Sequence, residues 1–224
     1  MMKYNCSERG RSMVEMMGYL AVVMSVVVAI GRIVSSAFDT HRYSTATLQV
    51  AELATSIVKA GAIDVDYREI LADINGSGNE NGAEGAKGEN KMNLIPSSFR
   101  RAGNKIFHVF GGTVTVGCSL FDSTTTGEET CNGKRIDQFS ITFDHLSKKQ
   151  CTELAMKNWQ ANKYIDLFAL RVNSTIWFWP AYGSEDASSG SYVFPVKRAT
   201  LTGTDDDNAV CQSGDVNTLT WVFN

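Results

Sequence analysis

Between Arg11 and Arg32 the chain carries a single charged side chain, Glu15, in an otherwise apolar stretch. Roughly twenty helical residues at about 1.5 Å each cross the ~30 Å hydrocarbon core of a membrane. A carboxylate inside such a segment costs about 2.5–3.5 kcal/mol on insertion scales, so it needs a partner or a purpose. A plain anchor has no use for it. The pattern therefore predicts a membrane-spanning helix whose carboxylate serves assembly with another molecule.

The segment ahead of this apolar stretch is short and polar. They carry Lys3 and Arg9, and they end at Gly10. Because positive charge keeps its side of a membrane segment in the cytoplasm, the N-terminus is predicted to lie inside and the bulk of the chain on the far side.

These features together resemble the class III signal of type IV pilins and pseudopilins. The shared pattern is a short basic leader, Gly10, an apolar helix, and Glu15 at the fifth position after the glycine. The resemblance implies that a prepilin peptidase cuts between Gly10 and Arg11 and that the new amino group is methylated. It further implies that Glu15 pairs with the N-terminal amine of a neighbouring subunit in a filament. Such pairing neutralises two opposite charges where neither is easily solvated.

The resemblance places the chain in the bacterial inner membrane before assembly, with its N-terminus inside and its C-terminus outside, and afterwards in an extracellular or periplasmic filament. The implied partners are identical or related pilin subunits, the prepilin peptidase and an inner-membrane assembly platform. Two alternatives remain open. One is an ordinary secretory signal cleaved before Phe38, and the other is an uncleaved anchor on an unrelated periplasmic domain. Neither explains Glu15.

We expect four segments along the chain: a leader (1–10), a membrane-spanning or filament-core helix (11–34), an amphipathic continuation of that helix (35–61), and a globular head (62–224). No proline interrupts the stretch from Ser12 to about Ala60, and Gly61 is a plausible C-cap. In its second half, one helix face carries Leu48, Ala51, Thr55 and Val58, and an adjacent face carries Val50, Leu53 and Ile57. Either face could pack on the head while the other meets neighbouring helices.

The head is predicted to have the α+β class, with a mainly antiparallel sheet and short inserted helices packed against the long N-terminal helix. Runs rich in β-branched and aromatic residues predict the strands, and an amphipathic pattern with Ser147 as N-cap predicts the main inserted helix. The predicted strands are 105–110, 113–118, 136–143, 164–172, 175–179, 191–196 and 218–223, and the predicted helices are 64–74 and 147–160.

The cysteines indicate an exported, disulfide-bonded head. Cys6 lies in the leader, which leaves Cys118, Cys131, Cys151 and Cys211. Four cysteines without a CxxC pair allow three connectivities. The polar, glycine-containing stretch between Cys118 and Cys131 favours a short closed loop, which would leave Cys151 to pair with Cys211. A zinc site is the disfavoured alternative, because the cysteine spacings do not fit and the histidines are scattered.

The middle of the chain also resembles the globular domain of type IVb pilins. The resemblance rests on Phe110-Gly111-Gly112 followed by a strand, then the strand 139–143, then Cys151 on a helix that begins near Ser147. In that family the helix cysteine bonds to one near the C-terminus, which implies the pair Cys151–Cys211. Together with the N-terminus, the resemblance covers nearly the whole chain, except for residues 173–208, and it implies a pilin fold.

Other constellations are weaker. We expect no direct binding to nucleic acid. The net charge is −3, and the sequence has no basic stripe with interleaved aromatic residues. The acidic run 205–208 lacks the alternating ligands of a calcium loop, and the aromatic run 177–182 fits either a buried strand or a contact with sugars or a neighbouring subunit. No nucleophile motif appears. We therefore expect no enzymatic activity, no cofactor and no metal.

The predicted function is that of a structural subunit, a major or minor pilin, of a type IV pilus-like filament. A secretion-system pseudopilin is the alternative within the same class. From another class, the alternative is a membrane-anchored periplasmic binding protein that uses the aromatic run 177–182. That alternative predicts no leader cleavage and no role for Glu15.

Overall fold

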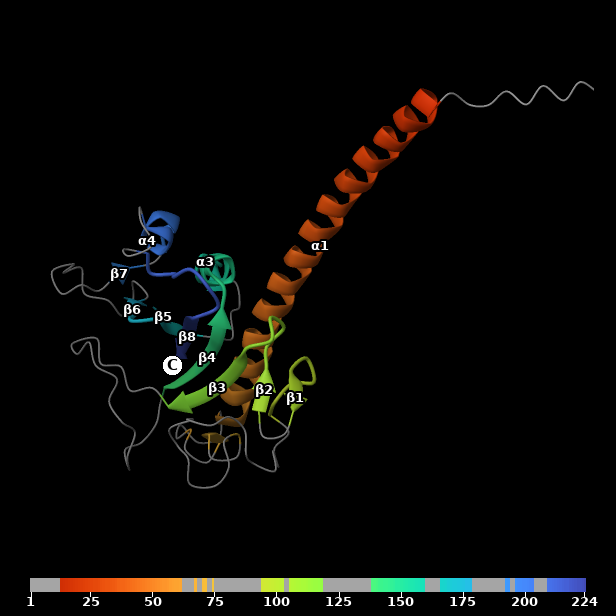
Figure 1. Cartoon of the computed structure of the whole chain (residues 1–224). Helices are drawn as coiled ribbons and strands as arrows, with labels where there is room; N and C mark the ends of the chain where they lie inside the picture. The colour runs from red at the N-terminus through yellow and green to blue at the C-terminus, as the bar shows by residue number, and fades with distance from the viewer. Residues whose placement is uncertain are drawn as a thin grey trace, which may run out of the picture. The chain divides into compact units, whose positions relative to one another are not determined.

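The computed structural model of the chain describes residues 13–61, 67, 70–71, 74, 94–102, 105–118, 138–159, 166–178, 192–193, 196–203 and 209–224. The chain divides into two compact units, residues 1–41 and 42–224. One helix, α1 (Met13–Gly61), contributes to both (Figure 1). The boundaries predicted after residues 10, 34 and 61 stay predictions, and residues 1–10 lie outside the described part of the chain.

Helix α1 is long because no proline interrupts it. Gly61, the last described residue of the helix, packs against Tyr67, since a Cβ at this position would lie 2.4 Å from the Tyr67 ring. Glycine at residue 61 therefore leaves room for that ring. The helix predicted from Ser12 to about Ala60 is confirmed over the described residues Met13–Gly61.

The described strands of the second unit form one eight-stranded sheet in the order β1-β2-β3-β4-β8-β5-β6-β7 (Figure 1). Neighbouring strands are antiparallel, except that β6 and β7 are parallel. A long helix followed by a mainly antiparallel sheet with short helices confirms the predicted α+β class. The strands are β1 (Arg100–Ala102), β2 (Lys105–Phe107), β3 (Thr113–Cys118), β4 (Phe139–Leu146), β5 (Leu167–Val172), β6 (Thr175–Phe178), β7 (Tyr192–Val193) and β8 (Asn217–Phe223).

The second half of α1 covers one face of this sheet. Val50, Leu53 and Ile57 are almost completely buried there, in one core with side chains from the central strands such as Ile141 and Trp221. The period of 3.6 residues per turn brings these helix residues to one face, and the period of two in β3 buries alternate side chains. Of the two helix faces identified in the sequence, this one meets the sheet.

Two short helices lie at one end of the sheet. Helix α3 (Lys148–Ala155) begins at the predicted N-cap, Ser147, whose hydroxyl accepts a hydrogen bond from the Gln150 backbone N–H while the Gln150 side chain accepts one from the Ser147 N–H. This reciprocal pair satisfies two backbone donors at the helix start. Helix α4 (Arg198–Thr202) packs against α3, and Arg198 forms an ion pair with Glu153 at 2.5 Å.

Several element bounds differ from the prediction. The strand predicted over 105–110 ends at Phe107, because residues 108–112 form a hydrogen-bonded turn in which Gly111 has a φ of 98°. The helix predicted over 147–160 ends at Ala155, after which the Trp159 indole N–H donates back to the Leu154 carbonyl oxygen. Strand β1 and helix α4 were not predicted. The predicted helix 64–74 lies mainly outside the described residues.

Candidate functional site

The first candidate site is the apolar half of α1, in the unit of residues 1–41. Every described side chain from Glu15 to Phe38 is exposed in this unit. Helix α1 is long and apolar enough to cross a membrane. An apolar surface of this extent marks contact with a membrane or another protein. Its largest exposed apolar side chains are Met13, Met16, Met17, Tyr19, Leu20, Val22, Val23, Met24, Val26, Val27, Val28, Ile30, Ile33, Val34 and Phe38.

Glu15 lies in the first turn of α1. There its carboxylate complements the partial positive charge at a helix N-terminus. The described residues therefore provide a negative charge at the start of an exposed apolar helix. Gly10 and Arg11, the predicted processing residues, lie outside the described part of the chain.

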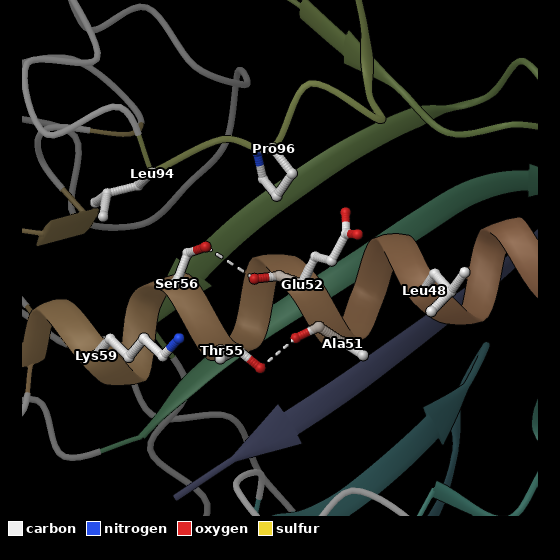
Figure 2. A pocket seen from close by; sticks show the side chains of 8 residues that line it. All are labelled: Leu48, Ala51, Glu52, Thr55, Ser56, Lys59, Leu94 and Pro96. Carbon is white, nitrogen blue, oxygen red and sulfur yellow. Dashed lines mark hydrogen bonds between the residues drawn. The ribbon is translucent and has the colours of Figure 1, made fainter.

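The second candidate site is the outward face of α1 in the second unit. Leu48 is 59% exposed, and with Ala51 and Thr55 it borders a shallow pocket of about 400 Å³ whose opposite wall is Leu94 and Pro96 (Figure 2). These residues belong to the helix face that does not meet the sheet. The pocket also has two charged side chains, Glu52 and Lys59.

Glu52 is positioned by a neighbouring loop. The Ser98 hydroxyl donates to Glu52 Oε2 at 2.8 Å. Glu52 itself remains exposed, so its interaction with solvent is largely preserved. The outward face thus combines apolar side chains with charges at its edge, an arrangement common at protein–protein contacts.

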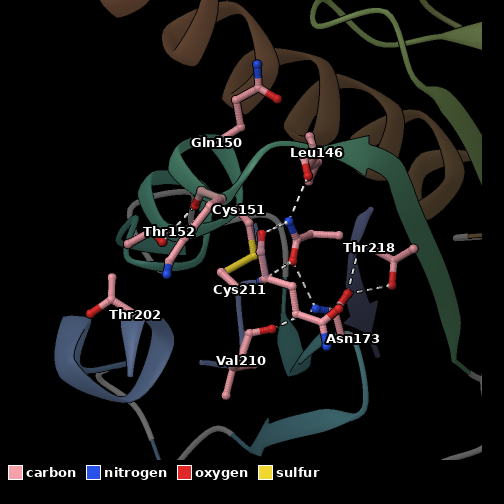
Figure 3. The surroundings of a disulfide bond; sticks show 12 residues. Leu146, Gln150, Cys151, Thr152, Asn173, Thr202, Val210, Cys211 and Thr218 are labelled. Carbon is pink, nitrogen blue, oxygen red and sulfur yellow. Dashed lines mark hydrogen bonds between the residues drawn. A yellow bond between two sulfur atoms is a disulfide. The ribbon is translucent and has the colours of Figure 1, made fainter. Parts of the chain in front are cut away.

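The third feature is the disulfide between Cys151 and Cys211, which joins α3 to the segment ahead of β8 (Figure 3). Both cysteines are completely buried, and their sulfur atoms lie 2.06 Å apart. The Cys211 backbone N–H also donates to the Leu201 carbonyl oxygen of α4 at 2.9 Å. The pairing implied by the resemblance to type IVb pilins is therefore present.

The other two cysteines are only partly described. Cys118, at the end of β3, is disulfide-bonded. Cys131 lies outside the described residues, so the pair Cys118–Cys131 stays a prediction.

Asn217 forms a hydrogen-bond network with the backbone of Gln212, which directly follows the disulfide-bonded Cys211 in the chain. Its side chain is completely buried, and its amide nitrogen donates to the carbonyl oxygens of Leu146 at 2.8 Å and Gln212 at 2.9 Å. Its amide oxygen accepts from the Gln212 N–H at 2.6 Å and from the Asn173 side chain at 3.1 Å. One buried amide thus fixes the Cys211 segment to the end of β4.

Asn173 completes this network from the turn between β5 and β6. Its amide nitrogen donates to the Val210 carbonyl oxygen at 2.7 Å, and its amide oxygen accepts from the Thr218 N–H at 2.8 Å. Its φ of 52° is a left-handed conformation that asparagine tolerates better than most residues. Asn173 begins an Asn-Ser-Thr sequon in the sequence, but its amide nitrogen is already used within the fold.

Replacing Asn217 by alanine is expected to lower the free energy of unfolding of the head by about 3 kcal/mol, because several buried donors and acceptors lose their partner. The measurement is urea unfolding of the full chain in detergent. Gln212→Ala is the matched control, since Gln212 joins the network through its backbone and its side chain is exposed. We expect that control to change stability by about 0.5 kcal/mol or less. Equal losses in the two variants would contradict the role of the Asn217 amide.

The fourth feature is the turn from His108 to Gly112, which contains the Phe-Gly-Gly sequence noted above. The buried His108 ring stacks on Phe143 with 4.6 Å between ring centroids. Its Nε2 lies 2.9 Å from the Asp144 carbonyl oxygen, and its Nδ1 accepts from the Phe110 N–H at 3.2 Å. A Cβ at Gly112 would lie 2.4 Å from His108 Nε2, so glycine is required there for this close approach.

The electrostatics of this turn are set by burial and by Asp144. Burial lowers the pKa of His108 below its ordinary 6.5, although the Asp144 carbonyl and the Asp144 charge act in the opposite direction. For Asp144, burial raises the pKa, but hydrogen bonds from the Thr113 hydroxyl, the His145 ring and the Thr113 N–H together lower it below the ordinary 3.8. The folded head therefore favours a neutral His108 beside an ionised Asp144.

The remaining sequence candidates are placed less favourably or lie outside the described residues. Trp177, from the aromatic run 177–182, is buried in the core of the head. Trp179, Tyr182 and the acidic run 205–208 lie outside the described part of the chain. Among the described residues, no cluster of three or more His, Cys, Asp or Glu side chains could hold a metal ion.

Sequence reasoning did not identify His108, Asn173 and Asn217 as organising residues. Asn173 carried one usable signal, because an asparagine between two predicted strands is a favoured turn residue. Asn217 lies at the start of a strand pattern that reads as apolar, and nothing local marks it as buried.

Comparison with known proteins gives a family for this head. The family model described as PilS N terminal matches residues 69–224. Among solved structures, the crystal structure of a type IV b pilin from Salmonella typhi is similar with a TM-score of 0.37 and 14% sequence identity, over 76% of this chain and 96% of that chain. A search of curated proteins gave no match. Because the family match covers more than half of the chain, the protein belongs to the PilS N-terminal family of type IV pilins.

Proposed function

We propose that the protein is a structural subunit, a major or minor pilin, of a type IV pilus-like filament. The family assignment supports the general role of a pilus subunit. The observation that carries the specific proposal is the helix α1, on which Glu15 is followed by an apolar surface that is exposed throughout its described part. A pilin head joined to such a helix has the two parts that a filament subunit requires.

In this proposal the apolar helix has two successive environments. It lies in the inner membrane before assembly, with the head on the outer side, and then packs against the same helix of other subunits in the filament. Burial of apolar side chains is favourable in both places, at about 25 cal/mol per Å² removed from water. Leaving the membrane is therefore offset by packing between helices.

Glu15 is proposed to form an ion pair with a neighbouring subunit when each new subunit joins the filament. A carboxylate that meets the free N-terminal amine of a neighbouring subunit neutralises both charges in an apolar surrounding. This pairing requires that every subunit begins at Arg11. The N-terminal amine of each subunit then lies only a short distance along the chain from its own Glu15. The prepilin peptidase and the inner-membrane assembly platform are the further partners that this sequence of events requires.

The first test is the intact mass and N-terminal sequence of the protein purified from its native membrane. We expect a chain that begins at Arg11, with or without one added methyl group. As a control, Gly10→Trp should retain the uncut mass, because a bulky side chain next to the scissile bond obstructs the peptidase. A wild-type chain that begins at Phe38 or at its original methionine would refute leader processing.

A further inference from the structure

The turn His108–Gly112 holds α1 against the head through two contacts. The Val109 backbone N–H donates to Gln49 Oε1 at 3.1 Å, and the Phe110 ring lies 5.4 Å from the Tyr43 ring between centroids. Gln49 is buried, and its amide nitrogen also donates to the Ser98 carbonyl oxygen at 2.7 Å. The position of this turn therefore determines whether the amide oxygen of the buried Gln49 keeps its hydrogen bond from Val109.

His108 maintains the turn in only one protonation state. Because the Asp144 carbonyl oxygen can only accept, the ring proton must be on Nε2, and Nδ1 must be free to accept from the Phe110 N–H. A second proton, on Nδ1, would place two hydrogen-bond donors, the Nδ1–H and the Phe110 backbone N–H, against each other. It would also place a positive charge on a ring that is 3% exposed and stacked on Phe143.

The titratable groups that act on His108 come from β4. Burial opposes the second proton most strongly and His145 opposes it as well, whereas the carbonyl oxygen and the charge of Asp144 favour it; the net result is a lowered pKa of His108. The Asp144 carboxylate is already engaged by Thr113 and lies 3.1 Å from the exposed His145 ring. Helix α1 faces the turn with Gln49 and Tyr43, neither of which is charged near neutral pH. No described neighbour therefore compensates a charged His108 in full.

We propose that the turn His108–Gly112 is an acid-sensitive switch that separates from α1 when His108 takes up its second proton. This inference does not depend on filament assembly. The direction of the pH dependence follows from the linkage between proton binding and opening of the turn. Because the open turn binds the proton more readily than the closed one, the contribution of neutral His108 is complete above pH 6.5 and is lost as the pH falls through the lower pKa of the closed form. The contribution of Asp144 is complete above pH 3.8 and is lost only below it, so it does not change between pH 7.5 and pH 5.

The test is hydrogen exchange of the full chain in detergent micelles between pH 7.5 and pH 5, with protection factors measured by NMR. We expect protection of the Val109 and Phe110 amides to fall by up to about tenfold per pH unit once His108 begins to bind the proton. The Ile141 amide, in the centre of the sheet, should keep its protection and serves as the internal reference.

Two variants separate His108 from the other titrating groups. His108→Gln keeps one acceptor and one donor but cannot be charged, so its Val109 protection should be independent of pH in this range. His145→Gln is the matched control, because it removes an exposed histidine of the same cluster, and it should keep the wild-type fall in protection. A fall in His108→Gln equal to that of the wild type, or no fall in the wild type, would overturn the proposal.

If His108→Gln does not fold, measurements on the wild-type chain alone still test the proposal. The proposal requires protection of the Val109 amide to fall as the pH drops from 6.5 toward the lower pKa of the closed form, and to be lost by the pH at which the His108 ring is protonated. Protonation of His108 while Val109 stays protected would overturn it.

Discussion

Replacing Cys151 and Cys211 together by alanine is expected to lower the free energy of unfolding of the head by about 4 kcal/mol. The two cysteines are 60 residues apart, and a bond that closes a loop of this length restricts the unfolded chain by roughly that amount. The double variant avoids a free thiol that could form a wrong disulfide. The measurement is urea or thermal unfolding of the full chain in detergent.

A second double variant, Cys118→Ala with Cys131→Ala, is the appropriate comparison. If these two cysteines pair as predicted, they close a much shorter loop, and the expected loss is smaller, about 3 kcal/mol. Hydrogen exchange should also separate the two variants, because loss of the Cys151–Cys211 bond should expose the Val210 and Gln212 backbone beside Asn217 first. An unchanged melting temperature in the Cys151/Cys211 variant would show that the bond does not stabilise the head.

Glu15→Val is expected to abolish filaments almost completely while leaving leader cleavage and the folding of the head intact. Without the carboxylate, the N-terminal amine of a neighbouring subunit would stay unpaired in an apolar surrounding, at about 2.5–3.5 kcal/mol per subunit. That penalty corresponds to a factor of roughly 100 in each addition step. The measurement is the yield of filaments sheared from cells, with the amount of processed subunit in the membrane measured in parallel.

Two further substitutions test whether the charge is responsible. Glu15→Gln keeps the size and polarity of the side chain but removes the charge, and it should resemble Glu15→Val. Glu15→Asp keeps the charge on a shorter side chain and should retain part of the filament yield. A normal number of filaments from Glu15→Val would remove the proposed assembly role, even if leader cleavage at Gly10 is observed.

The sequence predicts those parts of the fold that depend on local periodicity. Strand β3 is predicted to the residue, because Val114, Val116 and Cys118 alternate with polar or small neighbours and all point into the core. The start of α3 is also predicted correctly, since Ser147 with Gln150 is a complete capping pair in the sequence itself. Both features are determined within one turn or one strand.

What the sequence does not predict depends on contacts across long separations. The aromatic Phe110 extends a strand pattern, but the hydrogen bonds around His108 end the strand earlier, and one of them comes from Asp144 on another strand. Strand β1 contains Arg100 and Arg101 and has no strand-like pattern, yet it pairs with β2 at the edge of the sheet. In these cases tertiary pairing overrides local preference.

The candidate sites likewise include residues that the sequence identifies and residues that it does not. Glu15 could be identified from the sequence because a carboxylate in an apolar stretch is unusual at the level of composition alone. The choice between the two faces of α1 could not be made, since Leu48 is as apolar as Leu53 but remains exposed. Gln49, a polar residue between them, is buried because a loop and a turn supply its hydrogen-bond partners.

The place of β8 in the sheet has a consequence for how the head folds. This strand follows β7 in the chain, yet it lies between β4 and β5 and pairs with both. Until residues 217–223 join the sheet, the described strands before β8 in the chain form two separate groups with unpaired inner edges. Unpaired edges are the surfaces through which chains aggregate. The sheet of the head therefore becomes continuous only when β8 is in place, and a molecule that lacks the segment from Asn217 onward has no continuous sheet.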